Sequence, residues 1–199
     1  MNYFEILGRI GRYASDLLVT DANEQAYHNI AHTRYVVDRC AEIAHYYQLD
    51  TRDSFIVSAA GWFHDLGYVY GQPSGHEKRA VELLHQFGQA WQLDETVLDA
   101  VSSCILATIL PQKPTNLLES IVCDADLYHL GTTDFLNCDA LMRQEVQHRL
   151  GQQIPAREWI EATTKLLLSH EYHTLYCQQK LSRQKRRNLQ KLQESLLKL

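Results

Sequence analysis

The sequence predicts an all-α protein, a helical bundle formed by a single domain. Apolar residues recur at intervals of three and four positions along most of the 199-residue chain, which is the pattern of helices with one buried face. No segment alternates apolar and polar residues over four or more positions between turn signals, so we expect no β-sheet. The length suits one domain, and no repeat, linker or change in composition divides residues 1–199.

Three helices are predicted in the first third of the chain. In the first, five apolar residues share one face: Phe4, Leu7, Ile10, Ala14 and Leu17. The second runs from about residue 30 to residue 47, and its inward stripe is His32, Val36, Cys40 (or Arg39), Ile43, Ala44 and Tyr47. The third begins near Thr51 and ends at His64, and Gly67 then supplies a helix stop.

The remaining helices are placed by their start and stop signals. Residues 74–77, Ser-Gly-His-Glu, have the form of a capping box, which predicts a helix that starts at Ser74 and ends at Gly88. Asp94 starts the next helix, which must finish before Pro111. We expect further helices over 116–130, over about 133–150 and, as one or two helices, from 156 to the C-terminus.

Composition gives the broad class of protein. The chain is 45% hydrophobic and 22% charged, which is ordinary for a globular protein. A core of this size needs no metal or disulfide for stability, so a metal would serve function. No apolar run approaches the roughly 18 residues of a membrane span, and the N-terminus lacks the unbroken apolar segment of a signal peptide. The five scattered cysteines suit a reducing compartment. We therefore expect a cytoplasmic protein with no membrane partner.

Charge is distributed unevenly along the chain. The formal net charge is −5, but residues 178–199 hold seven Lys or Arg and one acid, which gives +6 there and −11 elsewhere. A basic helix can bind nucleic acid or an acidic partner, or it can steer anionic substrates by its field. We favour a solvated helix that docks through four leucines, namely Leu181, Leu189, Leu192 and Leu196. A nucleic-acid partner is therefore not expected. The sequence gives no indication of oligomeric state.

Ionisable residues interrupt the apolar pattern in three separate helices. His32 occupies the inward stripe of its helix, His64 and Asp65 end the most apolar helix, and Asp126 lies on the inward side of a later one. A lone inward histidine is most often a hydrogen-bonded core residue, and a carboxylate at a helix end is most often a cap. Together, however, two imidazoles and two carboxylates indicate a divalent metal site, which bundles build from inward side chains on facing helices.

Four motifs contain or follow these residues in order: YHNIAHTRYV (27–36), GWFHDLGY (61–68), SGHEKRAVELL (74–84) and IVCDADLYHLG (121–131). Over about residues 25–131 the chain thereby resembles the HD-domain superfamily of metal-dependent phosphohydrolases. The resemblance implies one divalent metal ion (Mn, Fe, Co, Ni, Zn or Mg) held by His32, His64, Asp65 and Asp126. The last motif, residues 121–131, resembles the A-D-x-L segment of the family, and this match assigns the last ligand to Asp126 rather than to Asp124.

The resemblance implies hydrolysis of a phosphate mono- or diester, with a small phosphorylated molecule, most commonly a nucleotide, as the substrate. A divalent ion activates water at neutral pH and polarises a phosphoryl oxygen. Asp65 would also orient the attacking water. His76 is a further catalytic candidate; alternatively, it contacts the substrate or simply stands at the start of a helix. Three cations are candidates for holding the phosphate, each with the alternative of a solvated surface charge: Arg34, Lys78 and Arg79.

The sequence departs from the family pattern in two places. Some nucleotide-hydrolysing members carry an acidic residue three or four positions beyond the His-Asp doublet, but residues 67–69 are Gly-Tyr-Val. The general acid or base is therefore unassigned, and a non-catalytic module that senses a nucleotide is the alternative. Two-metal members, including oxygenases, carry more histidines; residues 102–110 contain none, so one metal is expected, with His76 and His85 as reserve ligands. His28 either shares the face of His32 or has no role.

Overall fold

The computed structural model describes residues 2–20, 25–70 and 73–199, and within them it contains helices and no β-strand. The α-helices are α1 (Tyr3–Thr20), α2 (Ile30–Tyr46), α3 (Thr51–Phe63), α4 (His76–Trp91), α5 (Glu95–Ala107), α6 (Leu117–Asp126), α7 (Phe135–Leu150), α8 (Ala156–Ser169) and α9 (Leu175–Leu196). Two 3-10 helices, η1 (Leu66–Tyr70) and η2 (Leu127–Gly131), follow α3 and α6. The predicted all-α fold is confirmed.

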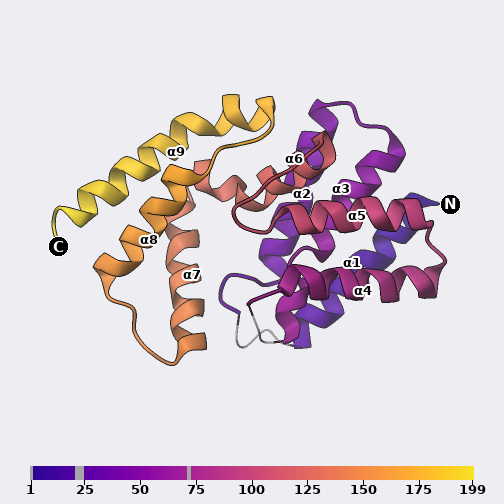
Figure 1. The fold of residues 1–199 in the computed structure, drawn as a ribbon, viewed down its shortest axis with the longest axis horizontal. Helices are drawn as coiled ribbons and strands as arrows, with labels where there is room; N and C mark the ends of the chain where they lie inside the picture. Colours follow the sequence, from indigo (N-terminus) through magenta and orange to yellow (C-terminus); the bar gives the residue numbers. More distant parts are fainter. Residues whose placement is uncertain (1, 21–24, 71–72) are drawn as a thin grey trace.

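The helices form two packed groups (Figure 1). Helices α1 to α6 surround the larger apolar core, which the first residues of α9 also enter. Helices α7, α8 and α9 lie on the other side and share a smaller apolar cluster with η2: Leu127, Leu130, Phe135, Leu167 and Leu192. Because η2 follows α6 directly and contributes two of those residues, it joins the two groups at the end of α6.

Helix α3 is the centre of the larger group. It packs against α1, α2, α5 and α6, and eight of its residues are buried. A helix that is apolar on all sides is stable only when other helices surround it. Its C-terminal end is therefore held inside the protein, which is where the His-Asp doublet follows.

The buried face of α1 differs at its start from the predicted one. The prediction that Phe4 faces the core is wrong, because its side chain is 88% exposed. Tyr3 takes that place and stacks on Phe55 of α3, with ring centroids 4.7 Å apart. Ile10 and Ala14 are buried as predicted. At the start of α1, apolar residues spaced by three and four positions are compatible with either Tyr3 or Phe4 on the inward face. Packing against α3 selects Tyr3.

Both predicted ends of α4 are wrong. Ser74 forms no capping box, because Gly75 is the N-cap residue, with a φ of 73° and no side-chain cap. The helix also continues through Gly88 to Trp91. A Cβ atom on Gly88 would lie 2.6 Å from a methyl group of Leu98, so this glycine allows α4 to pack closely on α5 rather than ending it.

Asp124 ties α6 to the start of α9. Its carboxylate is fully buried and accepts hydrogen bonds from the backbone N–H groups of His173 and Thr174, both at 2.8 Å, and from the Thr174 hydroxyl at 2.6 Å. The segment predicted from residue 156 to the C-terminus is therefore two helices, since these bonds fix the chain between them. Likewise, the helix predicted over 116–130 is α6 followed by η2.

Helix α9 docks on the protein through part of its apolar stripe. Leu181 and Leu192 are buried, and the Asn188 amide donates to the carbonyl groups of Leu130 and Thr132 at 2.9 and 2.8 Å. The Lys180 ammonium group lies 2.6 Å from a carboxylate oxygen of Glu42 on α2. Lys185 also donates a hydrogen bond to the carbonyl of His170. Two cations of α9, Lys180 and Lys185, therefore help to hold this helix on the rest of the protein.

Two compositional expectations can be compared with the structure. No helix in the described part of the chain is long and apolar enough to cross a membrane. All five cysteines are free; four are buried, and Cys138 is half-buried.

Candidate metal centre

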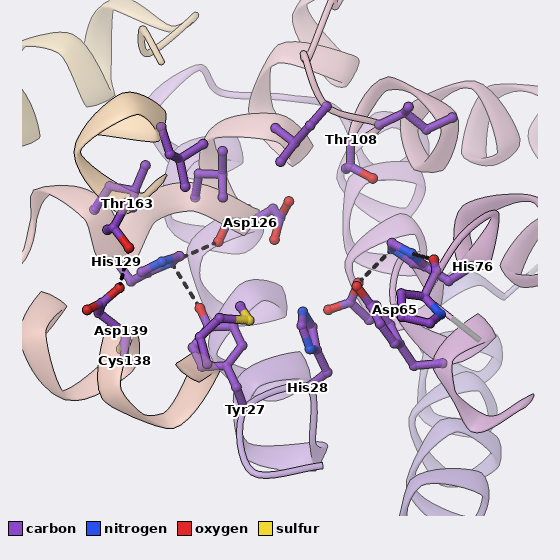
Figure 2. A pocket seen from close by; sticks show the side chains of 18 of the residues that line it. Tyr27, His28, Asp65, His76, Thr108, Asp126, His129, Cys138, Asp139 and Thr163 are labelled. Carbon is purple, nitrogen blue, oxygen red and sulfur yellow. Dashed lines mark hydrogen bonds and ion pairs between the residues drawn. The ribbon is translucent and has the colours of Figure 1, made fainter. Parts of the chain in front are cut away.

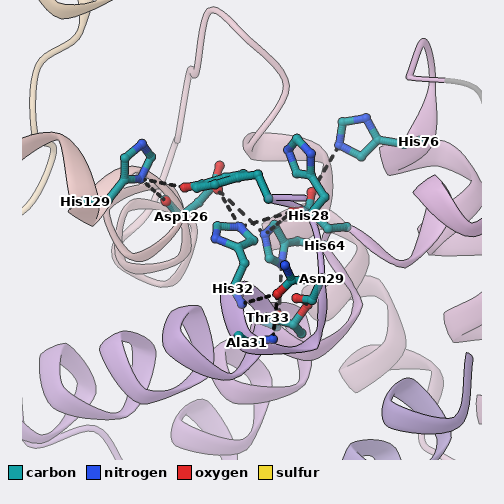
Figure 3. A network of polar contacts seen from close by, with 12 residues as sticks. His28, Asn29, Ala31, His32, Thr33, His64, His76, Asp126 and His129 are labelled. Atoms are coloured by element: carbon teal, nitrogen blue, oxygen red, sulfur yellow. Dashed lines mark hydrogen bonds and ion pairs between the residues drawn. The ribbon is translucent and has the colours of Figure 1, made fainter. Parts of the chain in front are cut away.

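Three segments that are distant in sequence bring four ionisable side chains together. His32 lies in the first turn of α2, His64 and Asp65 follow α3, and Asp126 ends α6. Nε2 of His32 lies 3.2 Å from Oδ2 of Asp65 and 3.9 Å from Oδ1 of Asp126. Nε2 of His64 lies 3.0 and 3.6 Å from the same two atoms. Figure 3 shows His32, His64 and Asp126 directed at one another.

The donor atoms of this cluster are suited to a divalent cation. One atom each of His32, His64 and Asp126 lies within 4.8 Å of the others, a spacing that could hold a metal ion. Nε2 of both histidines and Oδ2 of Asp65 are buried and form no hydrogen bond, although they lie close together. Buried polar atoms without partners are costly. A cation bound by these lone pairs would satisfy all of them with mixed nitrogen and oxygen ligands.

The backbone around the doublet sets the orientation of His64. Its Nδ1 lies 2.9 Å from the carbonyl oxygen of Gly61, one turn back in α3. The ring N–H therefore donates to that carbonyl, which leaves Nε2 as the lone-pair atom facing the cluster. Asp65 stands at the transition to η1, where the Tyr68 N–H donates to its carbonyl at 3.0 Å. The end of α3 thus turns two consecutive side chains toward one point.

The cluster requires positive charge. Burial alone would lower the pKa of His64, but the carboxylates of Asp65 and Asp126 raise it well above its ordinary value. Burial alone would raise the pKa of Asp65, but the imidazoles of His64, His28 and His32 lower it well below its ordinary value. Without another cation, protons on the imidazoles must neutralise the carboxylates, and a divalent ion can take that place.

His76, the further catalytic candidate, lies beside the doublet. Its Nδ1 lies 2.9 Å from the carbonyl of Pro73, and its Nε2 lies 3.4 Å from Oδ1 of Asp65 and 3.5 Å from a carboxylate oxygen of Glu77. Gly67 makes this approach possible, since a Cβ atom there would lie 1.9 Å from the backbone oxygen of His76. Asp65 therefore faces two imidazoles of the cluster with Oδ2 and His76 with Oδ1.

A second imidazole beside the cluster is held by a carboxylate from α7. Nδ1 of His28 lies 2.6 Å from Oε1 of Glu145, which is 1% exposed. The other oxygen of Glu145 accepts the backbone N–H groups of Tyr27 and His28 at 2.8 and 2.9 Å. The His28 ring also stacks on Tyr68, with centroids 4.2 Å apart. Burial alone would raise the pKa of Glu145, but its bonds with His28 lower it to about 2.

Comparison with known proteins identifies the family. The profile of the HD domain matches residues 29–131, just over half of the chain. The chain belongs to the HD domain family. HD domains are, in general, metal-dependent hydrolases. The matched range includes the residues whose side chains form the cluster and ends with η2.

The HD fold also has a counterpart among solved structures. The crystal structure of a predicted HD superfamily hydrolase from an uncultured Thermotogales bacterium superposes with a TM-score of 0.60. The alignment covers 98% of this chain and 91% of that chain at 20% sequence identity, so the likeness concerns the fold. The alignment therefore extends beyond the HD domain match into α7, α8 and α9. No curated protein matches this HD chain.

A cavity of about 570 Å³ adjoins the candidate metal centre of the HD domain. Asp65 and His76 line one side of it, and Asp126 and His28 lie nearer the middle of the view (Figure 2). Asp139 and Thr163, from α7 and α8, lie on the opposite side of the view from His76. The cavity therefore lies between the HD domain and the C-terminal helices, and both groups of helices supply its lining.

The predicted phosphate-binding cations lie outside this cavity. Neither Arg34 nor Lys78 nor Arg79 belongs to its described lining. The Arg79 guanidinium donates to the carbonyl groups of Gly67 and Ser74 at 3.1 and 2.9 Å, so it supports the turn before α4. A role for these cations in substrate binding stays a prediction, and the lining of the cavity gives it no support.

Sequence reasoning gave no role to His129. Its Nδ1 lies 3.3 Å from the carbonyl of Asp126 and 3.0 Å from the hydroxyl of Tyr27. Burial, with the charge of His32, lowers the pKa of His129 to about 4, so this imidazole is neutral at neutral pH. Its position three residues after Asp126 was the only available signal. Glu145 gave none, because nothing in the sequence of α7 indicates which residue it contacts.

Proposed function

We propose that this HD protein is a metal-dependent phosphohydrolase that acts on a phosphate mono- or diester, and that a nucleotide is the class of substrate to test first. One observation carries the proposal: the buried, unpartnered atoms of His32, His64 and Asp65 lie close to Asp126, and the two aspartates also line a cavity of about 570 Å³. Membership of the HD family supports a hydrolase.

In this proposal His32, His64, Asp65 and Asp126 hold one divalent ion. Mixed nitrogen and oxygen ligands suit Mn, Fe, Co, Ni, Zn or, less well, Mg. The bound ion would activate a water molecule and polarise a phosphoryl oxygen. Asp65 has a second task in this proposal: Oδ1, which lies 3.4 Å from Nε2 of His76, would orient the attacking water together with that imidazole.

His28 supplies the acid or base that the sequence left unassigned. Glu145 takes the Nδ1 side of the ring, so Nε2 is the atom available to the cavity. A histidine oriented by a buried carboxylate is a recurrent device for passing a proton to a leaving group. His28 would therefore donate the proton that the departing oxygen needs, and stacking on Tyr68 restrains its ring.

The test is phosphate release from a panel of nucleoside mono-, di- and triphosphates and cyclic nucleotides, with each candidate metal in turn. We expect turnover with at least one metal, and we expect Asp65→Ala to abolish it while the circular-dichroism spectrum is retained. Asp99→Ala, which removes an exposed carboxylate of α5, is the matched control and should keep full activity. Binding of a nucleotide without turnover by any metal would reject the enzyme and favour the sensing module.

A further inference from the structure

The C-terminal helices place a fixed carboxylate in the wall of the cavity. Oδ1 of Asp139, on α7, accepts the indole N–H of Trp159 at 3.0 Å and the hydroxyl of Thr163 at 2.9 Å. Both donors belong to α8 and line the same cavity. Two donors on one oxygen fix the carboxylate and leave Oδ2 as an acceptor. Figure 2 shows the Asp139–Thr163 pair apart from Asp65 and His76.

Much of the remaining lining of the cavity is apolar, including Leu127, Leu130, Phe135, Met142 and Leu166. His129 lies between Asp139 and Asp126 (Figure 2). Side chains of this kind favour a flat or apolar group and cannot hydrogen-bond to a string of phosphates. Asp139 is half-buried, and Oδ2 has no donor among the two that fix Oδ1. An acceptor in a largely apolar wall favours a ligand that carries a donor there, since a ligand without one would cover Oδ2 and leave it without a hydrogen bond.

The charge of the cavity limits the number of phosphates. Its described lining contains Asp65, Glu77, Asp126 and Asp139 but no Lys or Arg, and the seven residues outside the described ranges include neither. One divalent ion can offset the charge of a single phosphate. A second or third phosphate would add negative charge that no Lys or Arg of the described lining offsets, and the carboxylates of Glu77 and Asp139 would repel it.

We propose that the substrate is a phosphate monoester with a single phosphate, an apolar or aromatic body and a hydroxyl or N–H donor that binds Oδ2 of Asp139. This inference rests on the proposed function and narrows it. Nucleoside monophosphates belong to the class, because a base supplies both the flat body and the donor, whereas nucleoside triphosphates do not belong to it.

The test uses matched pairs of substrates with and without the donor. One pair is thymidine 5′-monophosphate and its N3-methyl analogue; the other is 4-(2-hydroxyethyl)phenyl phosphate and 4-propylphenyl phosphate. Asp139→Asn is the informative variant, since its amide oxygen still accepts from Trp159 and Thr163 while its NH2 group replaces Oδ2. We expect kcat/KM for the donor-bearing member to fall about tenfold or more, mainly through KM, and that for its partner to change less than about twofold.

Further measurements separate this role from a structural one. Thr163→Val, which removes one of the two donors to Oδ1, should give the same selective loss in smaller measure and replaces Asp139→Asn if that variant does not fold. Calorimetry should show weaker binding of thymidine to Asp139→Asn than to the wild type. Wild-type kcat/KM for thymidine 5′-monophosphate should exceed that for the triphosphate by about tenfold or more.

The possible failures are distinguishable. Equal losses on both members of each pair, unchanged kinetics on both, or a preference for the triphosphate would overturn this inference while phosphate release persisted. Absence of phosphate release from every ester with every metal would overturn the proposed function itself.

Discussion

Glu145 and His28 are 117 positions apart in sequence, yet their side chains meet at 2.6 Å beside the candidate metal centre. The contact joins α7 to the segment immediately before α2, and so joins the C-terminal helices to the HD domain. Arg149 adds a second ion pair to Glu145 at 2.6 Å. A buried carboxylate with this many partners holds the imidazole in one orientation, which is the requirement for directed proton transfer.

The first prediction concerns this pair. We expect His28→Gln to lower kcat by about a hundredfold, in the range of a lost acid–base catalyst, with little change in metal affinity. Glu145→Gln should lower kcat by a smaller factor, because the imidazole remains but loses its fixed orientation. Steady-state kinetics and metal analysis on both variants provide the check.

The double variant distinguishes a positioning role from general damage. If Glu145 acts through His28, adding Glu145→Gln to His28→Gln should produce no further fall in kcat. Multiplication of the two losses would show that Glu145 acts independently of the imidazole. Glu82→Gln, an exposed change on α4, is the control for substitution of a glutamate on a helix.

The second prediction concerns the stability of α9 docking as pH changes. Burial alone would raise the pKa of Glu42 from 4.5, but bonds from Lys180, Tyr176 and Tyr128 lower it to about 2. The unfolded chain therefore takes up this proton first, so the stabilisation from Glu42 is complete above about pH 4.5 and is lost as pH falls toward about 2.

Accordingly, Glu42→Gln should lower the free energy of unfolding at pH 7 by about 1 kcal/mol, a modest value because the Lys180 partner is half exposed. The difference from the wild type should shrink steadily between about pH 4.5 and pH 2. Urea unfolding at several pH values measures it. A difference that stayed constant over this range would contradict the assignment of charge to Glu42.

The third prediction concerns the contact between η2 and α9. A Cβ atom on Gly131 would lie 2.5 Å from Cβ and 2.8 Å from the backbone oxygen of Leu181. Gly131→Ala must therefore push α9 away, and we expect a loss of about 1–3 kcal/mol in thermal or urea unfolding. Gly8→Ala is the matched control: its Cβ atom would meet only a flexible arginine at 3.9 Å, so it should stabilise α1 by about 0.5–1 kcal/mol.

Local patterns explain why much of the fold was predictable. Helix α2 follows the stripe of His32, Val36, Cys40 and Ile43, because inward residues of a helix must recur every three to four positions. Asp94 caps α5 as predicted, since a helix start needs an acceptor for its free N–H groups. The ordered His, His-Asp and Asp motifs gave the members of the cluster, and the structure brings these four side chains together.

Contacts between distant residues explain what the sequence did not reveal. The pattern around Tyr3 and Phe4 fits two adjacent faces, and only the position of α3 decides between them. The sequence at Ser74 has the form of a capping box, but Gly75 occupies the N-cap position. The next residue, His76, packs against Gly67, a contact that the local sequence does not specify. The Asp139 subsite needs α7 beside α8, which no short motif specifies.

The fourth prediction compares Asp124 with Asp126, two carboxylates separated by one residue on α6. Asp124 is fully buried and accepts three hydrogen bonds from the segment before α9, whereas Asp126 faces the two imidazoles and the cavity. We expect Asp124→Asn to cost about 2 kcal/mol or more of stability and to leave metal affinity unchanged. Asp126→Asn should keep the stability of the metal-free protein within about 1 kcal/mol and weaken metal binding by about a hundredfold or more.

Thermal unfolding of metal-stripped protein, with and without added Mn²⁺, separates these two effects. A ligand that binds only the folded state stabilises it by an amount that grows with the logarithm of the ratio of ligand concentration to Kd, so tighter binding gives a larger rise in Tm. The wild type and Asp124→Asn should therefore show the same rise in Tm from different starting temperatures, and Asp126→Asn should show little or none. A rise in Asp126→Asn equal to that of the wild type would exclude Asp126 as a ligand, because a side chain that contributes to the metal site cannot lose its charge without weakening the bound state.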